Sequence, residues 1–202
     1  MLTIRGVGGT YEDVFLPLHG EHMAQNAACA LAAVESFLGG GSGALDGAVV
    51  GEGFAAVSVP GRLEVIRRSP TVMLDVAHNP QGAEALVEAV TEAFSFQRLV
   101  GVIGILSDKD AVGILSALEP LFDEVVITKS TSPRAIDPDD LGSLASEIFG
   151  SERVTVEASL PDAIDLAVTA AESEGALEGA GVLVTGSVTV VGEARSLLRS
   201  RR

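Results

Sequence analysis

The segment Leu74–Leu86, LDVAHNPQGAEAL, places an acid, a histidine and an asparagine within five residues. Asp75 could bind a ribose hydroxyl, as acids after a strand of an α/β sheet often do, or it could accept a hydrogen bond within its loop. His78 could cap a helix, donate to a carboxylate or carry a proton. Asn79 and Pro80 are typical of a helix start. The residue types alone leave the roles of Asp75 and His78 open.

Two further segments carry groups that could bind an anion. Lys109 in LSDKDA stands between two acids at a predicted helix start. A cation at that position opposes the helix dipole unless an anion lies nearby, and the alternative is a surface ion pair. The segment Thr185–Ser187, TGS, could offer hydroxyls and backbone amides to an anion, or it could only cap the next helix.

Several well-known motifs are missing. The only lysines are Lys109 and Lys129, and neither follows a glycine-rich loop, so the sequence contains no G-x-x-x-x-G-K-[ST] phosphate loop. GVGG at Gly6 lies between two predicted strands, which does not fit a dinucleotide fingerprint. His19 and His22 lack the spacing of metal ligands on a helix. The sequence therefore predicts no metal site.

The composition narrows the class of protein. Among 202 residues, 28 acids and 13 bases give a net charge of −15, which disfavours a nucleic-acid or anionic membrane surface. An anionic substrate is still possible, because a pocket can be locally positive. No apolar run reaches the length of about 20 residues that spans a bilayer, and the start has no leader pattern. We expect a cytoplasmic protein, in which Cys29 of the run NAACALAA is buried.

The chain divides at about Pro60. Before it, strands are expected at 2–6 and 11–18, a helix at 20–40 and a short helix before the Pro-Gly turn. These few elements lack a partner layer, so residues 1–59 are predicted to be the end of a larger domain.

After the turn, residues 60–202 alternate regularly between strands and helices. Strands are expected at 62–68, 71–77, 98–106, 124–130, 153–158 and 181–187, and helices at 81–95, 109–119, 138–149, 161–174 and 189–199. This alternation predicts an α/β fold, a Rossmann-like, mostly parallel sheet with helices on both faces. Ligands of such sheets bind at the carboxyl ends of the strands. Four segments follow those ends: Asp75–Asn79, Ser107–Asp110, Thr128–Arg134 and Thr185–Ser187.

Five segments, in this order, resemble one family. They are LPLHGEHMAQNAACALAAVE, VPGRLEVI, LDVAHNPQGAEAL, GILSDKD and VLVTGSVTVVGEAR. Together they resemble the C-terminal part of bacterial folylpolyglutamate synthase/dihydrofolate synthase, of the Mur ligase superfamily. The resemblance covers essentially the whole chain. It implies a Mur ligase C-terminal domain at 60–202 and, at 1–59, the remnant of a central ATP-binding domain.

The resemblance also implies a reaction, the ATP-dependent addition of L-glutamate to dihydropteroate or folates. ATP phosphorylates a carboxylate, the amine of glutamate attacks the acyl phosphate, and magnesium ions clamp the phosphates. By motif, Asn26 is similar to an asparagine that contacts adenine. Arg62 is similar to an arginine that reaches the ATP phosphate as the domains close, and Asp75 to an acid near the ribose. Met23 departs from the family, which commonly has glutamine there.

Three further residues are implied on the glutamate side. His78 and Ser187 are similar to residues that face the incoming glutamate, and Lys109 is a candidate for its carboxylate. Arg62 and His78 are thus the expected catalytic residues.

The family's phosphate loop and its magnesium and carbamylated-lysine residues belong to an N-terminal domain that has no counterpart in this sequence. ATP and Mg²⁺ are therefore expected to be held largely by that missing domain. We expect the chain to be inactive alone, as a fragment, a mis-started gene or half of a split enzyme with a separate N-terminal half.

Two alternatives are a non-catalytic ligand-binding or interaction module that kept the fold, and a small-molecule-binding α/β domain unrelated to ligases. Asp75→Ala and His78→Ala in a reassembled enzyme should distinguish the ligase, because each should lower activity and leave folding intact.

Overall fold

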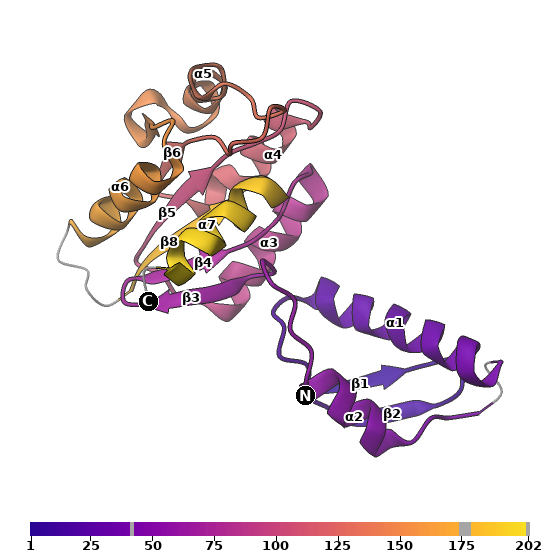
Figure 1. The fold of residues 1–202 in the computed structure, drawn as a ribbon. Coiled ribbons are helices and arrows are strands. Elements are labelled where there is room, and N and C mark those ends of the chain that lie inside the picture. The colour runs from indigo at the N-terminus through magenta and orange to yellow at the C-terminus, as the bar shows by residue number, and fades with distance from the viewer. Residues whose placement is uncertain (41–42, 174–178, 201–202) are drawn as a thin grey trace. The chain divides into compact units, whose positions relative to one another are not determined.

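A computed structural model describes residues 1–40, 43–173 and 179–200. They form two compact units, Met1–Pro60 and Gly61–Arg202 (Figure 1). The predicted glycine/serine loop after residue 40 lies partly outside the described residues. No helix of the described part is long and apolar enough to cross a membrane.

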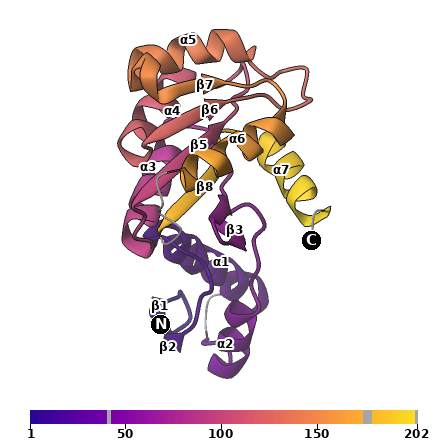
Figure 2. The ribbon, with the colours of Figure 1, turned by 90° about the vertical axis from the view of Figure 1, so that its left-hand side faces the viewer.

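The first unit is a hairpin with two helices, seen from a second side in Figure 2. Strands β1 (Leu2–Arg5) and β2 (Thr10–Val14) pair antiparallel. The helices are α1 (Glu21–Gly39) and α2 (Gly47–Ala55). Their shared core consists of Ile4, Tyr11, Val14, Ala27, Leu31 and Val50. The unit therefore has a small apolar core of its own.

Helix α1 buries a single stripe, and Cys29 is not on it. Met23, Ala27 and Leu31 recur every four residues and are buried. Cys29 is exposed, because two residues along a helix correspond to a rotation of about 200°. The expectation of a buried cysteine was wrong. In an alanine-rich run the small side chains do not reveal which face of the helix is buried.

The stripe ends in a buried acid, Glu35. Its carboxylate accepts hydrogen bonds from the hydroxyl of Tyr11, at 2.7 Å, and from the backbone amide of Val7. A Cβ atom on Gly6 would overlap this carboxylate. The bond from Tyr11 is the main cause that lowers the pKa of Glu35, and backbone amides of the turn, including Gly8, add to it. The GVGG segment thus wraps an internal carboxylate.

This arrangement makes the stability of the first unit depend on pH. The lowered pKa means that the ionised Glu35 stabilises the folded unit fully above the unfolded-state pKa, near 4.5. That contribution is lost as the pH falls through the lower folded pKa. Amide hydrogen exchange of β1 and β2 should accelerate in Glu35→Ala at pH 7. Glu12→Ala, an exposed acid of β2, is the control, and equal protection in both variants would contradict the role of Glu35.

The second unit contains a six-stranded sheet in the order β3-β4-β8-β5-β6-β7. Its strands are β3 (Glu64–Arg68), β4 (Thr71–Leu74), β5 (Arg98–Ile103), β6 (Glu124–Ile127), β7 (Val154–Val156) and β8 (Ala180–Thr185). All neighbours pair in parallel except the edge strand β3, which is antiparallel to β4. The predicted mostly parallel α/β sheet is confirmed.

Helices cover both faces of this sheet (Figure 1). They are α3 (Pro80–Ala93), α4 (Ala111–Leu118), α5 (Pro138–Phe149), α6 (Leu160–Glu172) and α7 (Val188–Ser200), with short 3-10 helices η1 (Glu119–Leu121) and η2 (Ser151–Arg153). Helices α3, α4 and α5 pack on one face, and α6 and α7 on the other. Each helix lies within two residues of its predicted bounds, although residue 174 of the predicted range falls outside the described residues.

The five strands of the parallel part end earlier than predicted at their carboxyl ends, whereas β3 ends at Arg68 as predicted. Strand β4 stops at Leu74 and β5 at Ile103, so Gly104, expected inside a strand, belongs to the following loop. A Cβ atom on Gly104 would lie 3.0 Å from the carbonyl oxygen of Thr128. The apolar run continues into this loop because the loop packs against its neighbour instead of facing water.

Candidate functional site

The candidate site lies at the carboxyl ends of three neighbouring strands, β4, β8 and β5. Because these strands are parallel, the loops that follow them meet at one edge of the sheet. Gly186, with φ of +101°, passes so close to the preceding loop that a Cβ atom would lie 2.9 Å from the carbonyl oxygen of Gly104. The fold thus places the segments after Leu74, Thr185 and Ile103 beside one another.

Arg62 lies on a turn with unusual backbone angles. Gly61 has φ of +72° and Leu63 has φ of +45°. The carbonyl oxygen of Gly61 accepts a hydrogen bond from the amide of Val76 at 2.9 Å. The amide of Leu63 donates to a carboxylate oxygen of Asp75 at 2.8 Å. The turn is therefore attached on both sides of Arg62 to the loop after β4.

Asp75 makes the loop contacts that were one of its two expected roles. Its side chain is buried, and its second carboxylate oxygen accepts the amide of Ala77 at 2.8 Å. Each carboxylate oxygen of Asp75 therefore accepts a backbone amide, one from the turn and one from its own loop.

Among the described residues, the side chain of Arg62 has no ion-pair partner. Its side chain is half-buried, and within residues 1–40, 43–173 and 179–200 its guanidinium has neither a hydrogen bond nor an ion pair. This is notable in a chain with 28 acids and a net charge of −15. A guanidinium on a half-buried residue of a fixed turn is suited to an anion from outside the chain.

The position of the His78 ring favours one tautomer. Its Nδ1 atom lies 2.9 Å from the carbonyl oxygen of Val76, and since a carbonyl only accepts, Nδ1 must carry the proton. In the neutral ring, Nε2 is then an acceptor. Asn79 and Pro80 form the helix start that was predicted: Oδ1 of Asn79 accepts the amide of Gly82 at 2.7 Å, and Pro80 opens α3.

Ser187 caps α7 and belongs to a row of hydroxyls. It is only 1% exposed, and its Oγ accepts the amide of Val190 at 3.2 Å. Oγ1 of Thr189 lies 3.2 Å from Ser187 Oγ and accepts the hydroxyl of Ser130 at 2.9 Å. The sequence did not reveal Thr189 and Ser130 as partners of Ser187, because hydroxyls in or before a first helical turn indicate only a cap. Thr185, also buried, has no hydrogen-bond partner for its hydroxyl in the described part of the chain.

Lys109 forms an ion pair, which the sequence analysis gave as the alternative to a nearby anionic ligand. Its Nζ lies 3.3 Å from Asp108, and a guanidinium nitrogen of Arg134 lies 3.4 Å from the same acid. The hydrogen bond from Lys109 is the main cause that lowers the pKa of Asp108. Two cations therefore share one carboxylate. With Asp110 at the start of α4, the charges of this loop and of Arg134 balance. The sequence did not single out Arg134 as a partner of Asp108.

The remaining predicted residue lies in the first unit. Asn26 is exposed on α1, while Met23, which stands where the family commonly has glutamine, is buried in the stripe of that helix. Within the described residues, no three His, Cys, Asp or Glu side chains are placed so that they could share a metal ion.

Comparison with known proteins decides the family. The Mur ligase, glutamate ligase domain family matches residues 61–188. The chain belongs to the Mur ligase family. The predicted resemblance is thereby confirmed.

Similar proteins agree with this assignment. A dihydrofolate synthase/folylpolyglutamate synthase of Mycobacterium tuberculosis is 49% identical over 98% of this chain and 42% of its own length. The corresponding Escherichia coli protein is 32% identical over 96% of this chain and 42% of its own length. This Mur ligase chain thus spans about two fifths of such relatives.

Solved structures agree with the fold. Mycobacterium tuberculosis folylpolyglutamate synthase complexed with ADP has a TM-score of 0.92 at 50% identity, covering 98% of this chain and 44% of that one. Escherichia coli FolC in complex with DHPP and ADP has a TM-score of 0.80 at 30% identity, covering 96% and 42%. A Yersinia pestis enzyme complexed with AMPPNP and Mn ion has a TM-score of 0.73 at 26% identity, covering 94% and 42%. The domain assignment and the roles of single residues stay predictions.

Because Asp75 accepts two backbone amides, its removal is expected to lower the stability of the fold as well as the activity. Asp75→Ala leaves the amides of Leu63 and Ala77 without their acceptor, so we expect a loss of about 1–3 kcal/mol in the free energy of unfolding, together with faster exchange of the Leu63 amide. Urea denaturation and hydrogen exchange measure both. Asp123→Ala, which removes the acceptor of the Leu99 amide, is the matched control and should leave Leu63 protected. Unchanged protection of Leu63 in Asp75→Ala would refute the proposed attachment.

Proposed function

We propose that this chain is the C-terminal portion of an ATP-dependent ligase that adds L-glutamate to dihydropteroate or folates. The observation that carries the proposal is Arg62, a guanidinium without a partner among the described residues, on a turn fixed beside Asp75. Membership of the Mur ligase family and the names of the similar proteins support the reaction. The cytoplasmic location stays a prediction from the sequence.

In this proposal the two units have different origins. Residues 60–202 act as the Mur ligase-like C-terminal domain, and residues 1–59 are the end of a central ATP-binding domain. Asn26 contacts the adenine, Asp75 accepts a ribose hydroxyl and Arg62 contacts a phosphate. The side chain of Asn26 is exposed and therefore accessible to a nucleotide.

The proposed reaction has two steps. A carboxylate oxygen of the folate substrate attacks the γ-phosphorus of ATP, the bond to the bridging oxygen breaks, and ADP leaves. The amine of glutamate then attacks the acyl carbon, and phosphate leaves with the electrons of the C–O bond. Arg62 neutralises charge that develops on the transferred phosphoryl group.

The same chain supplies groups for glutamate. Nε2 of His78, an acceptor in the tautomer set by Val76, takes a proton from the attacking amine. The ammonium group of Lys109 binds a carboxylate of glutamate, and Ser187, buried at the start of α7, belongs to the glutamate side of the site. Lys109 can do so while paired with Asp108, because a second cation, Arg134, also faces that acid.

The described residues do not form a site that fits a magnesium ion. The described ranges contain no cluster of three acids, histidines or cysteines, so no step of the mechanism is assigned to a metal held here. In the proposal, Mg²⁺ and most of the triphosphate are held by an N-terminal domain, encoded with this chain or as a separate half.

The surface of the first unit supports such a partner. An apolar groove of about 370 Å³ between α1 and α2 is lined by residues that include Leu31, Val34 and Phe54. Nearby, Phe37 is 88% exposed and Leu38 66% exposed. Exposed apolar surface of this kind marks an interaction site. We assign it to the preceding region of the ligase.

The test is a fusion in which this chain replaces the matching 42% of the Mycobacterium tuberculosis relative. The fusion should form ADP and phosphate only when ATP, glutamate and dihydropteroate or a folate are all present. Arg62→Ala should lower kcat/KM for ATP by roughly 10²-fold. Arg68→Ala, an exposed arginine of β3, is the control and should retain activity.

Other results would exclude the proposal. Turnover by the unfused chain would show that no further domain is needed. A folded fusion that binds a folate without turnover would favour the alternative, a non-catalytic module that kept the fold.

The assigned proton transfer predicts a separate kinetic signature for His78. His78→Ala should lower kcat in the fusion by about 10²–10⁴-fold and change KM for ATP little, because the histidine acts on the amine and not on the nucleotide. His22→Ala, in α1 of the first unit, is the control. A rise in KM for ATP with unchanged kcat would show instead that His78 binds nucleotide.

A further inference from the structure

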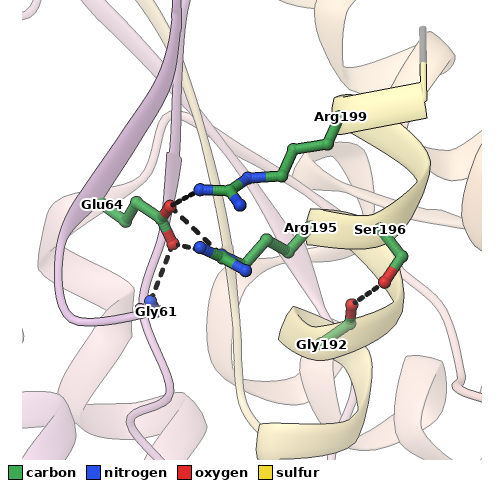
Figure 3. Close-up of polar contacts among 6 residues, drawn as sticks. All are labelled: Gly61, Glu64, Gly192, Arg195, Ser196 and Arg199. Atoms are coloured by element: carbon green, nitrogen blue, oxygen red, sulfur yellow. Dashed lines mark hydrogen bonds and ion pairs between the residues drawn. The ribbon is translucent and has the colours of Figure 1, made fainter. Parts of the chain in front are cut away.

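Glu64 lies two residues after Arg62 and joins three segments of the second unit (Figure 3). One carboxylate oxygen accepts the backbone amide of Gly61 at 2.9 Å. The same oxygen lies 2.8 Å from Nε of Arg195, and the other oxygen lies 3.3 Å from Arg199. Figure 3 shows both guanidinium groups reaching from α7 toward this one carboxylate. A single side chain therefore connects the turn to the middle and end of α7.

The contact is partly sheltered from water. The side chains of Glu64 and Arg195 are 19% and 26% exposed, whereas that of Arg199 is 55% exposed. Burial acts to raise the pKa of Glu64, but the bonds from Arg195 and Gly61 and the charge of Arg199 outweigh it and lower the pKa. Sheltered, charge-assisted bonds are stronger than exposed ion pairs. Arg195 is therefore the main anchor.

Glu64 completes the attachment of the turn. The amide of Gly61 is held by Glu64 and its carbonyl by Val76, while the amide of Leu63 is held by Asp75. The positive φ of Leu63, unfavourable for a residue with a side chain, needs such support. Two carboxylates thus determine the backbone on either side of Arg62.

We propose that Glu64 is a positioning residue, which through Arg195 fixes the turn Gly61–Leu63 and so directs the guanidinium of Arg62 toward its anion. The proposal rests on the proposed phosphate contact of Arg62. In this role Glu64 acts through Arg62 and not by contact with a substrate. It determines the position of the Arg62 guanidinium group. Misplacement of a contact by about 1 Å can cost roughly 10²-fold in rate.

Helix α7 links the anchor of Glu64 to the glutamate side of the site. The helix begins at Val188, directly after Ser187, and carries Arg195 about two turns later. The residue assigned to glutamate and the anchor of the residue assigned to phosphate therefore belong to one rigid element. Movement of α7 would displace both contacts together.

The first test uses the 202-residue chain and does not depend on activity. Exchange of the Gly61 amide should become at least about tenfold faster in Glu64→Ala, while amides of β5 stay protected. Glu64→Gln, which keeps an oxygen acceptor but loses the charge, should lie between Glu64→Ala and the unchanged chain. The control is Glu119→Ala, which removes the partner of Arg153 at 2.6 Å and should leave Gly61 unchanged. Unchanged exchange of Gly61 in Glu64→Ala would overturn the proposal.

The second test is a double-mutant cycle in the fusion. Glu64→Ala should lower kcat/KM for ATP at least about tenfold when Arg62 is present and have little further effect in the Arg62→Ala background. A purely structural role would instead give equal losses in both backgrounds, and that result would overturn the positioning role.

The two proposals can fail separately. If Arg62→Ala leaves kcat/KM unchanged in the active fusion, the assigned phosphate contact is wrong, and the positioning role toward an anion falls with it. If Arg62→Ala is damaging and Glu64→Ala is not, the phosphate contact stands and only the positioning role is wrong.

Discussion

The buried carboxylate of Asp75 holds two stretches of backbone at once, the turn that carries Arg62 and the loop that carries His78. It does so through the amides of Leu63 and Ala77, at 2.8 Å each. Because a buried amide without an acceptor is costly, both stretches depend on this acid. Asp75 thus makes the loop hydrogen bonds that were one of its two expected roles, and its contact with a ribose hydroxyl stays a proposal.

The rest of the second unit brings groups to that acid. Parallel pairing of β4, β8 and β5 places three loops at one edge, and close backbone contact at Gly104 and Gly186 keeps them together. Helix α7 starts at this edge after Ser187 and reaches back through Arg195 to Glu64. One sheet edge and one helix thus position the groups assigned to phosphate and to glutamate.

The sequence predicted much of this and missed identifiable parts. Helices such as α5 were predictable because caps and apolar periodicity agree, whereas Cys29 was misplaced because alanines hide the helix phase. Asp75 could be named from its place after a strand. The pairing of Glu64 with Arg195 could not, because 131 residues separate them and only the packing of α7 against β3 brings them together.

The central claim is that the fixed turn positions the guanidinium group of Arg62 to bind a phosphate of the nucleotide. A crystal structure of the fusion with a non-hydrolysable ATP analogue tests it directly. We expect a guanidinium nitrogen of Arg62 within hydrogen-bond distance, about 2.7–3.2 Å, of a phosphate oxygen, with Asp75 still accepting the amide of Leu63. A bound nucleotide whose phosphates lie beyond the reach of Arg62 would contradict it.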